Sequence, residues 1–518
     1  MARVGHGARV GRSRRRWMRV FFSPIVALAL VTRVHGAPSA MGLRKRPFKN
    51  TAARGRALGS TAREVYGEVL ETGVLVASFE LAGAQTFELI VDTGSSRTYL
   101  PCKGCASCGA HEAGRYYDYD ASADFSRVEC SACAGIGGKC GTSGVCRYDV
   151  HYLEGSGSEG YLVRDVVSLG GSVGNATVVF GCEERELGSI KQQSADGLFG
   201  FGRQAYALRA QLASASVIDD LFSMCVEGYE KLSGEHVGGL LTLGNFDFGA
   251  DAPALVYTPM VSSAMYYQVT TTSWTLGNSV VEGSRGVLTI IDSGTSYTYV
   301  PGNMHARFLQ LAEDAARESG LEKVAPPEDY PDLCFGNSGG LGWSTVSEYF
   351  PALKIEYHGS ARLTLSPETY LYWHQKNASA FCVGILEHDD NRILLGQITM
   401  RNTFTEFDVA RSQVGMASAN CEMLREKYVE HASESPRLPP PPPPPSPSQS
   451  PLPPPSPPGS SDDNDSGVFV YLAMPVVGII GVMGGSALMK KRDSNQWRRL
   501  EEDIGEHLDG EIELVDVP

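Results

Sequence analysis

The central part of this sequence lacks an excess of positive charge. Residues 66–489 contain 25 Lys and Arg residues against 49 Asp and Glu residues, in a chain of 518 residues with net charge −14. Nucleic acid is therefore excluded as an expected partner, because phosphates require a positive surface. The sequence also has no nucleotide-binding glycine loop and no Ser/His/Asp pattern, so it implies no cofactor. Its hydrophobic content of 42% suffices for two sizeable cores and excludes a small disulfide-rich peptide.

The N-terminal segment has the pattern of a signal peptide, which we place at residues 1–36. A basic stretch precedes the apolar run 20–31, which is too short to span a bilayer, and small residues follow it. A short buried helix is the alternative. Residues 37–65 remain basic and are interpreted as a leader or propeptide.

The C-terminal segment has the pattern of a type I membrane anchor. Residues 468–489 form a run of 22 without a charge, and three basic residues follow it. Positive charge stays on the cytosolic side, so the body is expected in the lumen and residues 490–518 in the cytosol. Residues 433–467 are predicted to be a stalk, since 15 of the 29 prolines lie in 436–458.

The twelve cysteines all lie between Cys102 and Cys421, in the expected luminal part, where disulfides are the default. The spacing of Cys102, Cys105, Cys108 and His111 could also suit zinc or an iron–sulfur cluster. We favour disulfides and expect no metal, and spacing leaves their connectivity open. Sequons predict glycosylation at Asn175 and Asn377.

An internal repeat carries the strongest functional signal. A β-branched apolar run leads into Asp92-Thr93-Gly94-Ser95, and a second leads into Asp292-Ser293-Gly294-Thr295, 200 residues later. Each copy is followed by an apolar pair and a glycine, at Leu198-Phe199-Gly200 and Leu394-Leu395-Gly396. Four matched elements in this order indicate two related halves, each delivering an aspartate into a tight turn.

These motifs resemble those of the pepsin-type aspartic proteases over roughly residues 66–422. The resemblance implies an all-β, bilobal fold with the active-site cleft between two pseudo-symmetric lobes. The N-terminal lobe would comprise residues 66–255 and the C-terminal lobe residues 256–432. Short strands rich in Val, Thr, Tyr and Ile, with few helices such as 305–319, agree with an all-β chain.

By this resemblance the chain is expected to be an endopeptidase acting on polypeptide substrates. Asp92 and Asp292 would be the catalytic pair, sharing one proton and activating water, since two neighbouring carboxylates cannot both ionise cheaply; the aspartate pair of this family is itself the known case of that principle. The residues expected to support them are Thr93, Gly94, Ser95, Ser293, Gly294 and Thr295.

A flap that closes over substrate is expected at residues 148–157, where an alternating strand runs into a Gly-rich tip. Tyr152 matches the flap tyrosine of the family, with Tyr148 as the competing candidate and an ordinary hairpin as the plain alternative. Tyr99 stands where pepsins usually carry a tryptophan.

The stretch 102–146 resembles the cysteine-rich insert of nepenthesin-type proteases. Together with the membrane span it most resembles the plasmepsin V-type enzymes, which implies cleavage of secretory cargo after an Arg-x-Leu-like motif. That resemblance implies the disulfides Cys334–Cys382 and Cys225–Cys421, and a substrate-arginine contact for Glu154. It also implies a location along the secretory pathway, in the ER, Golgi, vacuole or cell surface.

Two other functions remain open. A nepenthesin-like acid protease of broad specificity has the same motifs, and its cleavage sites would show an apolar preference instead of a fixed arginine. An inactive protease-fold receptor is disfavoured, because such scaffolds usually lose one aspartate or its glycine.

Overall fold

The computed structural model describes residues 59–68, 74–81, 85–109, 111, 115–152, 155–169, 173–228, 237–325, 333–336, 342–373, 380–429 and 512–513. The expected signal peptide, stalk and membrane span lie outside these residues, as do Glu154 and Asn377. The first strand begins at Thr61, so the last five residues of the segment expected to be a leader belong to the sheet.

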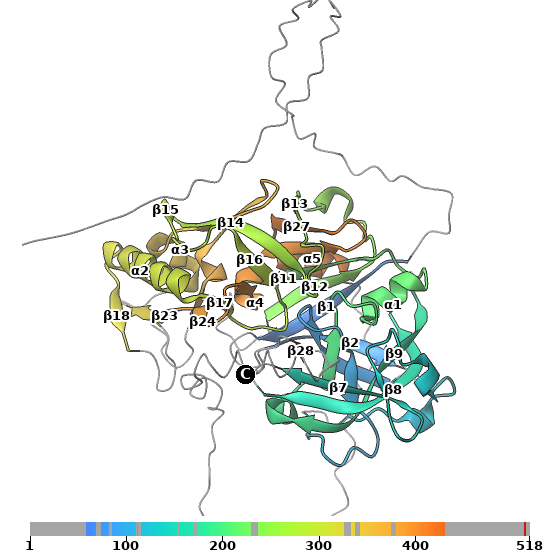
Figure 1. The fold of residues 1–518 in the computed structure, drawn as a ribbon. Coiled ribbons are helices and arrows are strands. Elements are labelled where there is room, and N and C mark those ends of the chain that lie inside the picture. The colour runs from blue at the N-terminus through green and yellow to red at the C-terminus, as the bar shows by residue number, and fades with distance from the viewer. Residues whose placement is uncertain are drawn as a thin grey trace, which may run out of the picture. The chain divides into compact units, whose positions relative to one another are not determined.

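Strands dominate the described residues, which confirms the predicted all-β class (Figure 1). In the N-terminal half they are β1 (Thr61–Glu68), β2 (Val74–Leu81), β3 (Gln85–Asp92), β4 (Tyr99–Pro101), β5 (Ser126–Arg127), β6 (Lys139–Cys140), β7 (Cys146–Tyr152), β8 (Gly157–Ser168), β9 (Asn175–Leu187), β10 (Gly197–Gly200), β11 (Leu221–Val226) and β12 (Val237–Leu243). In the C-terminal half they are β13 (Val256–Pro259), β14 (Gln268–Leu276), β15 (Ser279–Val280), β16 (Val287–Ile291), β17 (Thr298–Pro301), β18 (Glu322–Val324), β19 (Cys334–Gly336), β20 (Leu353–Tyr357), β21 (Arg362–Leu365), β22 (Leu371–Trp373), β23 (Ala380–Val383), β24 (Ile385–His388), β25 (Ile393–Leu395), β26 (Thr403–Asp408) and β27 (Gln413–Ser418).

The described helices are α1 (Leu208–Ser214), α2 (Gly302–Glu318), α3 (Val346–Tyr349), α4 (Gln397–Met400) and α5 (Cys421–Tyr428). Helix α2 buries Met304, Phe308, Ala312 and Ala316, which recur every four residues and so share one face. That face packs on the C-terminal sheet, where the Phe308 ring lies 6.2 Å from that of Trp274. The side chain of Asn420 accepts a bond from Met423 N and so caps the start of α5.

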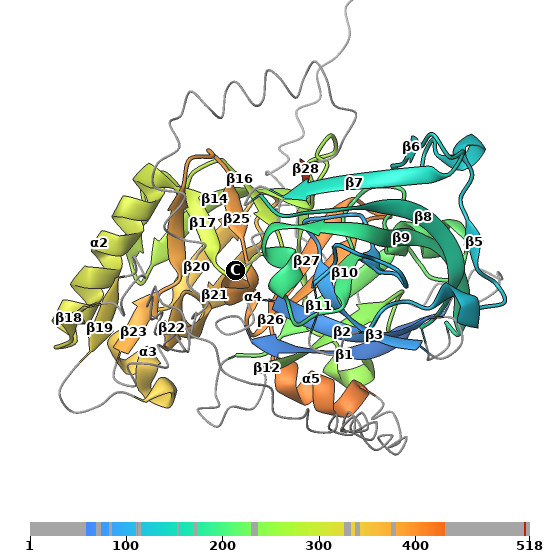
Figure 2. The ribbon, with the colours of Figure 1, turned by 90° about the horizontal axis from the view of Figure 1, so that it is seen from below.

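One sheet joins the two halves of the chain. Its order runs β13-β27-β26-β11-β12-β1-β2-β3-β10-β4-β9-β8-β7, so strands from the end of the body pair beside strands of the first half (Figure 2). A second sheet, β21-β20-β14-β16-β25-β17-β24, carries the C-terminal half, and β18, β19, β22 and β23 form a third. The C-terminal half thus has two sheets of its own, and it also adds β13, β26 and β27 to the sheet of the N-terminal half, which joins the two halves.

A two-residue strand, β28 (Ile512–Glu513), pairs in parallel with His151 and Tyr152 of β7. The expected cytosolic position of residues 490–518 stays a prediction.

Candidate active site

The two repeated motifs meet at the centre of the molecule. Asp92 is the last residue of β3, Asp292 follows β16 directly, and both side chains are fully buried. The apolar pairs of the repeat lie beside them: β10 runs parallel to β3 with Gly200 opposite Asp92, and β25 runs parallel to β16 with Leu395 opposite Ile291. The sequence repeat therefore corresponds to a structural repeat around the aspartates.

The two turns are linked by reciprocal hydrogen bonds. Thr93 Oγ1 donates to Ile291 O at 2.9 Å, and Ser293 Oγ donates to Val91 O at 2.7 Å. Each hydroxyl also accepts from the opposite backbone, from Ser293 N at 2.9 Å and from Thr93 N at 3.1 Å. All four bonds are buried, so the relative position of the two aspartate turns is fixed by these two side chains.

Gly94 and Gly294 are required by close approach. A Cβ at Gly94 would lie 2.6 Å from the carboxyl of Asp292, and one at Gly294 would lie 2.4 Å from Asp92 Oδ1. Their amides donate to the aspartates of their own turns, Gly94 N to Asp92 Oδ1 at 2.7 Å and Gly294 N to Asp292 Oδ1 at 2.8 Å. Any side chain here would occupy the space of the opposite carboxyl group.

The two carboxyl groups differ in their surroundings. Thr295 Oγ1 donates to Asp292 Oδ2 at 2.8 Å, whereas Asp92 Oδ2 and Ser95 Oγ are buried without a hydrogen-bond partner in the structure. Burial raises the pKa of Asp92 to about 6, and it raises the pKa of Asp292 well above its usual value, with the charge of Asp92 adding to the effect. The pair therefore retains a proton to higher pH than isolated aspartates do.

Gln397 is a supporting residue that the sequence reasoning missed. Its side-chain Nε2 donates to Ser293 O at 2.7 Å, and its backbone N donates to Thr295 O at 2.8 Å. In the other half Gly202 N donates to Ser95 O at 2.6 Å, so the backbone part of this contact is repeated. The sequence position of Gln397 could have indicated this role, because Gln397 directly follows Gly396, the glycine of the repeated apolar motif.

The expected flap is the hairpin of β7 and β8. Side chains of β7 alternate between buried and more exposed, and Gly155, at φ 99°, lies in the turn after it. Tyr152 ends β7, and its hydroxyl is hydrogen-bonded to that of Tyr99. The competing candidate, Tyr148, instead bonds Ser158 Oγ at 2.8 Å and stacks on the ring of Tyr99. Both tyrosines therefore contact Tyr99, and Tyr152 is the one whose hydroxyl is hydrogen-bonded to it.

The cysteine-rich insert is closed by disulfides and held on the Asp92 turn by an arginine that the sequence reasoning missed. The bonds are Cys102–Cys182, Cys105–Cys108, Cys130–Cys140 and Cys133–Cys146. Arg97 is buried five residues after Asp92 and donates to Ile136 O at 2.7 Å and to Gly137 O at 2.8 Å. Its guanidinium lies 4.3 Å from the Tyr206 ring centre.

The other two disulfides join Cys225 to Cys421 and Cys334 to Cys382, the pairs implied by the family resemblance. Asn175, the first residue of β9, is exposed, as a glycosylation site requires.

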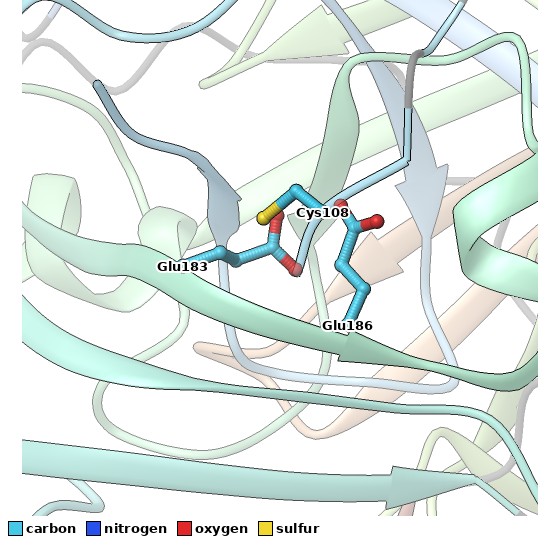
Figure 3. Close-up of side chains that lie close together, drawn as sticks. All are labelled: Cys108, Glu183 and Glu186. Carbon is cyan, nitrogen blue, oxygen red and sulfur yellow. The ribbon is translucent and has the colours of Figure 1, made fainter. Parts of the chain in front are cut away.

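One group of possible metal ligands occurs among the described residues. Cys108, Glu183 and Glu186 place ligand atoms within 4.8 Å of one another beside β9 (Figure 3). The sulfur of Cys108 is bonded to Cys105, so it offers no thiolate, which is the form that binds metals. His111, which the sequence analysis grouped with the nearby cysteines, is hydrogen-bonded through Nε2 to Glu186 Oε1 at 2.8 Å.

Comparison with known proteins agrees with this geometry. The model of the eukaryotic aspartyl protease family matches residues 82–419. The chain belongs to this family. It is 26% identical to aspartic proteinase 39 of Arabidopsis thaliana, over 65% of this chain and 72% of that one. It is 25% identical to nepenthesin-1 of Nepenthes gracilis, over 65% and 76%, and 27% identical to aspartic protease 5 of Toxoplasma gondii, over 65% and 35%. A crystal structure titled "edgp" shares the fold, with a TM-score of 0.55, 19% identity and coverage of 71% of this chain and 98% of that one.

This membership confirms an aspartic-type peptide hydrolase of pepsin-like fold. The family match covers both aspartate turns, the flap and the insert, and it ends before the expected stalk. Among the described residues, no helix is long and apolar enough to cross a membrane. Residues 468–489 lie outside them, so the anchor stays a prediction.

Proposed function

We propose that Asp92 and Asp292 are the catalytic pair of a membrane-anchored aspartic endopeptidase that cleaves proteins of the secretory pathway. The observation that carries the catalytic assignment is the reciprocal linkage of the two aspartate turns through Thr93 and Ser293. It holds two buried carboxyl groups together, each changing the pKa of the other.

The chemistry follows from one proton shared between two carboxyl groups. One carboxylate of the pair accepts a proton from the attacking water. The other carboxyl group keeps the shared proton and donates it to the carbonyl oxygen of the scissile peptide. The roles reverse as the tetrahedral intermediate collapses, and the proton returns to the pair. No covalent intermediate is needed.

The flap completes the site. Closure of the β7–β8 hairpin over a peptide excludes water, which strengthens the electrostatic interactions of the pair. Tyr152 lies at the end of β7, and its bond to Tyr99 sets the position from which the hairpin closes.

Anchoring and location rest on the sequence of the two ends. A signal peptide at 1–36 and a span at 468–489 would place the body in the ER, Golgi, vacuole or cell surface, with Asn175 and Asn377 available for glycosylation. Protease protection of microsomes tests this topology. If the added protease digests residues 490–518 and spares the body, the anchor is supported. If residues 490–518 are protected as well, the pairing of β28 with β7 is favoured instead.

Specificity after an Arg-x-Leu-like motif rests on Glu154, two residues beyond Tyr152 in the flap. A carboxylate facing a substrate guanidinium gains two charge-assisted bonds, so its loss should remove selection for arginine. Broad cleavage after apolar residues, as in a nepenthesin-like acid protease, is the alternative.

One experiment tests both catalysis and specificity. The full-length protein, solubilised in detergent, is incubated with a diverse peptide pool from pH 3 to 8, beside Asp292→Ala, Glu154→Ala and, as a matched control, Glu159→Ala. Loss of cleavage in Asp292→Ala supports the catalytic pair, and retained cleavage would refute it. An arginine preference that disappears only in Glu154→Ala supports the motif, and an apolar preference in all active forms supports the broad protease.

A further inference from the structure

The Cys105–Cys108 disulfide differs from the others in how little chain it closes. Its cysteines are only 3 residues apart, whereas the other five disulfides span 10 to 196 residues. Stabilisation by a disulfide grows with the loop that it closes, so this bond contributes least to the fold. Both cysteines are partly exposed, and Ala106 and Ser107 between them are exposed. A dissolved thiol can therefore reach this bond.

A buried carboxyl group lies directly beside this disulfide. Glu183 is 1% exposed, neither of its carboxyl oxygens has a hydrogen-bond partner, and the carboxyl lies within 4.8 Å of Cys108 Sγ (Figure 3). Burial raises the pKa of Glu183 well above its usual value, and the charge of Glu186 adds to the effect. Glu183 thus holds its proton to higher pH than an exposed glutamate does, and its carboxyl group is positioned against a sulfur atom.

A β-bulge produces this arrangement. Residues three apart in a regular strand point to opposite faces, yet Glu183 and Glu186 of β9 are both buried on one side. The register of β8 and β9 shifts at this point: Glu159 pairs with Arg185, and the next residue, Gly160, pairs with Glu183. Glu184 of β9 is therefore the extra residue of the bulge. The bulge turns both acids toward the cysteine loop.

The cysteine loop is held over β9 by bonds on either side of Cys108. Ser107 forms a parallel bridge with Arg185, and Gly109 N donates to Glu186 Oε2 at 2.7 Å. His111 Nε2 bonds the other oxygen of Glu186, so this second acid is fully engaged in positioning the loop. Of the two acids, Glu183 is the one whose carboxyl oxygens no hydrogen bond to the cysteine loop engages.

We propose that Cys105, Cys108 and Glu183 form a thiol–disulfide exchange site, separate from the peptidase centre, whose substrate is a small thiol of the glutathione class. The thiolate of the small thiol attacks Cys105 Sγ, forming a mixed disulfide and breaking the Cys105–Cys108 bond. Cys108 leaves as a thiolate and takes the proton of the Glu183 carboxyl. A second small thiolate attacks the sulfur of the first and releases Cys105 as a thiolate. The two protons that the small thiols lost to solvent on ionising return to the Cys105 thiolate and to the Glu183 carboxylate. Two thiols are oxidised to one disulfide, and one protein disulfide is reduced to two thiols.

The test follows each disulfide of the full-length protein in glutathione buffers of increasing reducing strength. Free thiols are trapped by alkylation and quantified by peptide mass spectrometry. Cys105–Cys108 is expected to open while the other five bonds stay closed. Glu183→Gln should slow its reduction about tenfold, because an amide cannot protonate the leaving thiolate. Glu184→Gln, an exposed neighbour on the same strand, should leave the rate unchanged.

Two results would overturn the proposal. One is equal reduction rates in Glu183→Gln and the unmodified protein, with both retaining peptidase activity as evidence of folding. The other result needs no variant, so it applies even if Glu183→Gln does not fold. In the unmodified protein, the Cys105–Cys108 disulfide would be reduced no earlier than the Cys130–Cys140 disulfide. Neither result depends on which peptides the protease cleaves.

Discussion

The hydroxyl groups of Tyr99 and Tyr152 are hydrogen-bonded to each other, and both side chains are almost completely buried. Tyr99 begins β4, a few residues after the Asp92 turn, and Tyr152 ends β7 of the flap hairpin. A tyrosine pair thus joins the Asp92 turn to the hairpin, at a place where pepsins usually carry a tryptophan.

We expect Tyr99→Phe to lower kcat/KM by about two- to tenfold, because it removes one hydrogen bond worth about 0.5–1.5 kcal/mol that positions the flap. Peptide cleavage kinetics measure the effect. Tyr148→Phe is the matched control, since it removes a bond to Ser158 on the neighbouring strand and leaves the Tyr99–Tyr152 contact in place. An equal loss in both variants would mean that general packing of the hairpin, not this contact, sets the rate.

Thr93→Ala should lower both stability and activity. The change leaves Ile291 O and Ser293 N without their buried partner, which should cost about 1–3 kcal/mol of unfolding free energy. Denaturant unfolding measures the loss. Thr93→Ser keeps the Oγ and should restore most of it, so a Thr93→Ser variant as unstable as Thr93→Ala would assign the effect to the lost methyl group.

The repeated motifs predicted the pairing of the two halves because they encode local geometry. An apolar strand, an aspartate and a glycine turn recur at Asp92 and Asp292, and the family resemblance then supplies the global arrangement. The hairpin at residues 148–157 could be predicted for the same reason, from an alternating strand and a Gly-rich tip, whereas the role of Tyr152 rests on the family resemblance and stays a prediction.

Contacts between distant segments could not be predicted in this way. Arg97 follows the Asp92 motif closely in the sequence, and nothing in its sequence neighbours shows that it reaches Ile136 and Gly137. The burial of both Glu183 and Glu186 depends on a β-bulge, which shifts the face of one strand by a single residue. Such features depend on strand register, and the sequence alone left the register open.

Stability should depend on pH through Asp92. Its pKa is raised in the folded state to about 6, so protonation stabilises the fold; this contribution is complete below its unfolded pKa and is lost as pH rises through about 6. Asp92→Asn removes the ionisation. Relative to the unmodified protein it should gain up to about 3 kcal/mol of unfolding free energy between pH 4 and pH 7.5.

Thermal and denaturant unfolding at several pH values measure this difference. The exposed Asp219 supplies the control, and Asp219→Asn should show no comparable rise across the same range. A constant difference between Asp92→Asn and the unmodified protein from pH 4 to pH 7.5 would contradict the raised pKa.

Arg97 should couple the cysteine-rich insert to the catalytic turn. Arg97→Met leaves two carbonyl groups of the insert without their charged donor, which should cost about 2–4 kcal/mol of unfolding free energy. Because those carbonyls lie between Cys133 and Cys140, hydrogen exchange should accelerate in residues 130–146 and stay unchanged in residues 342–373. Arg127→Met is the control, since Arg127 is exposed and lies over the ring of Tyr161. If exchange accelerates evenly over both halves, the loss is one of global stability, and Arg97 does not hold the insert in particular.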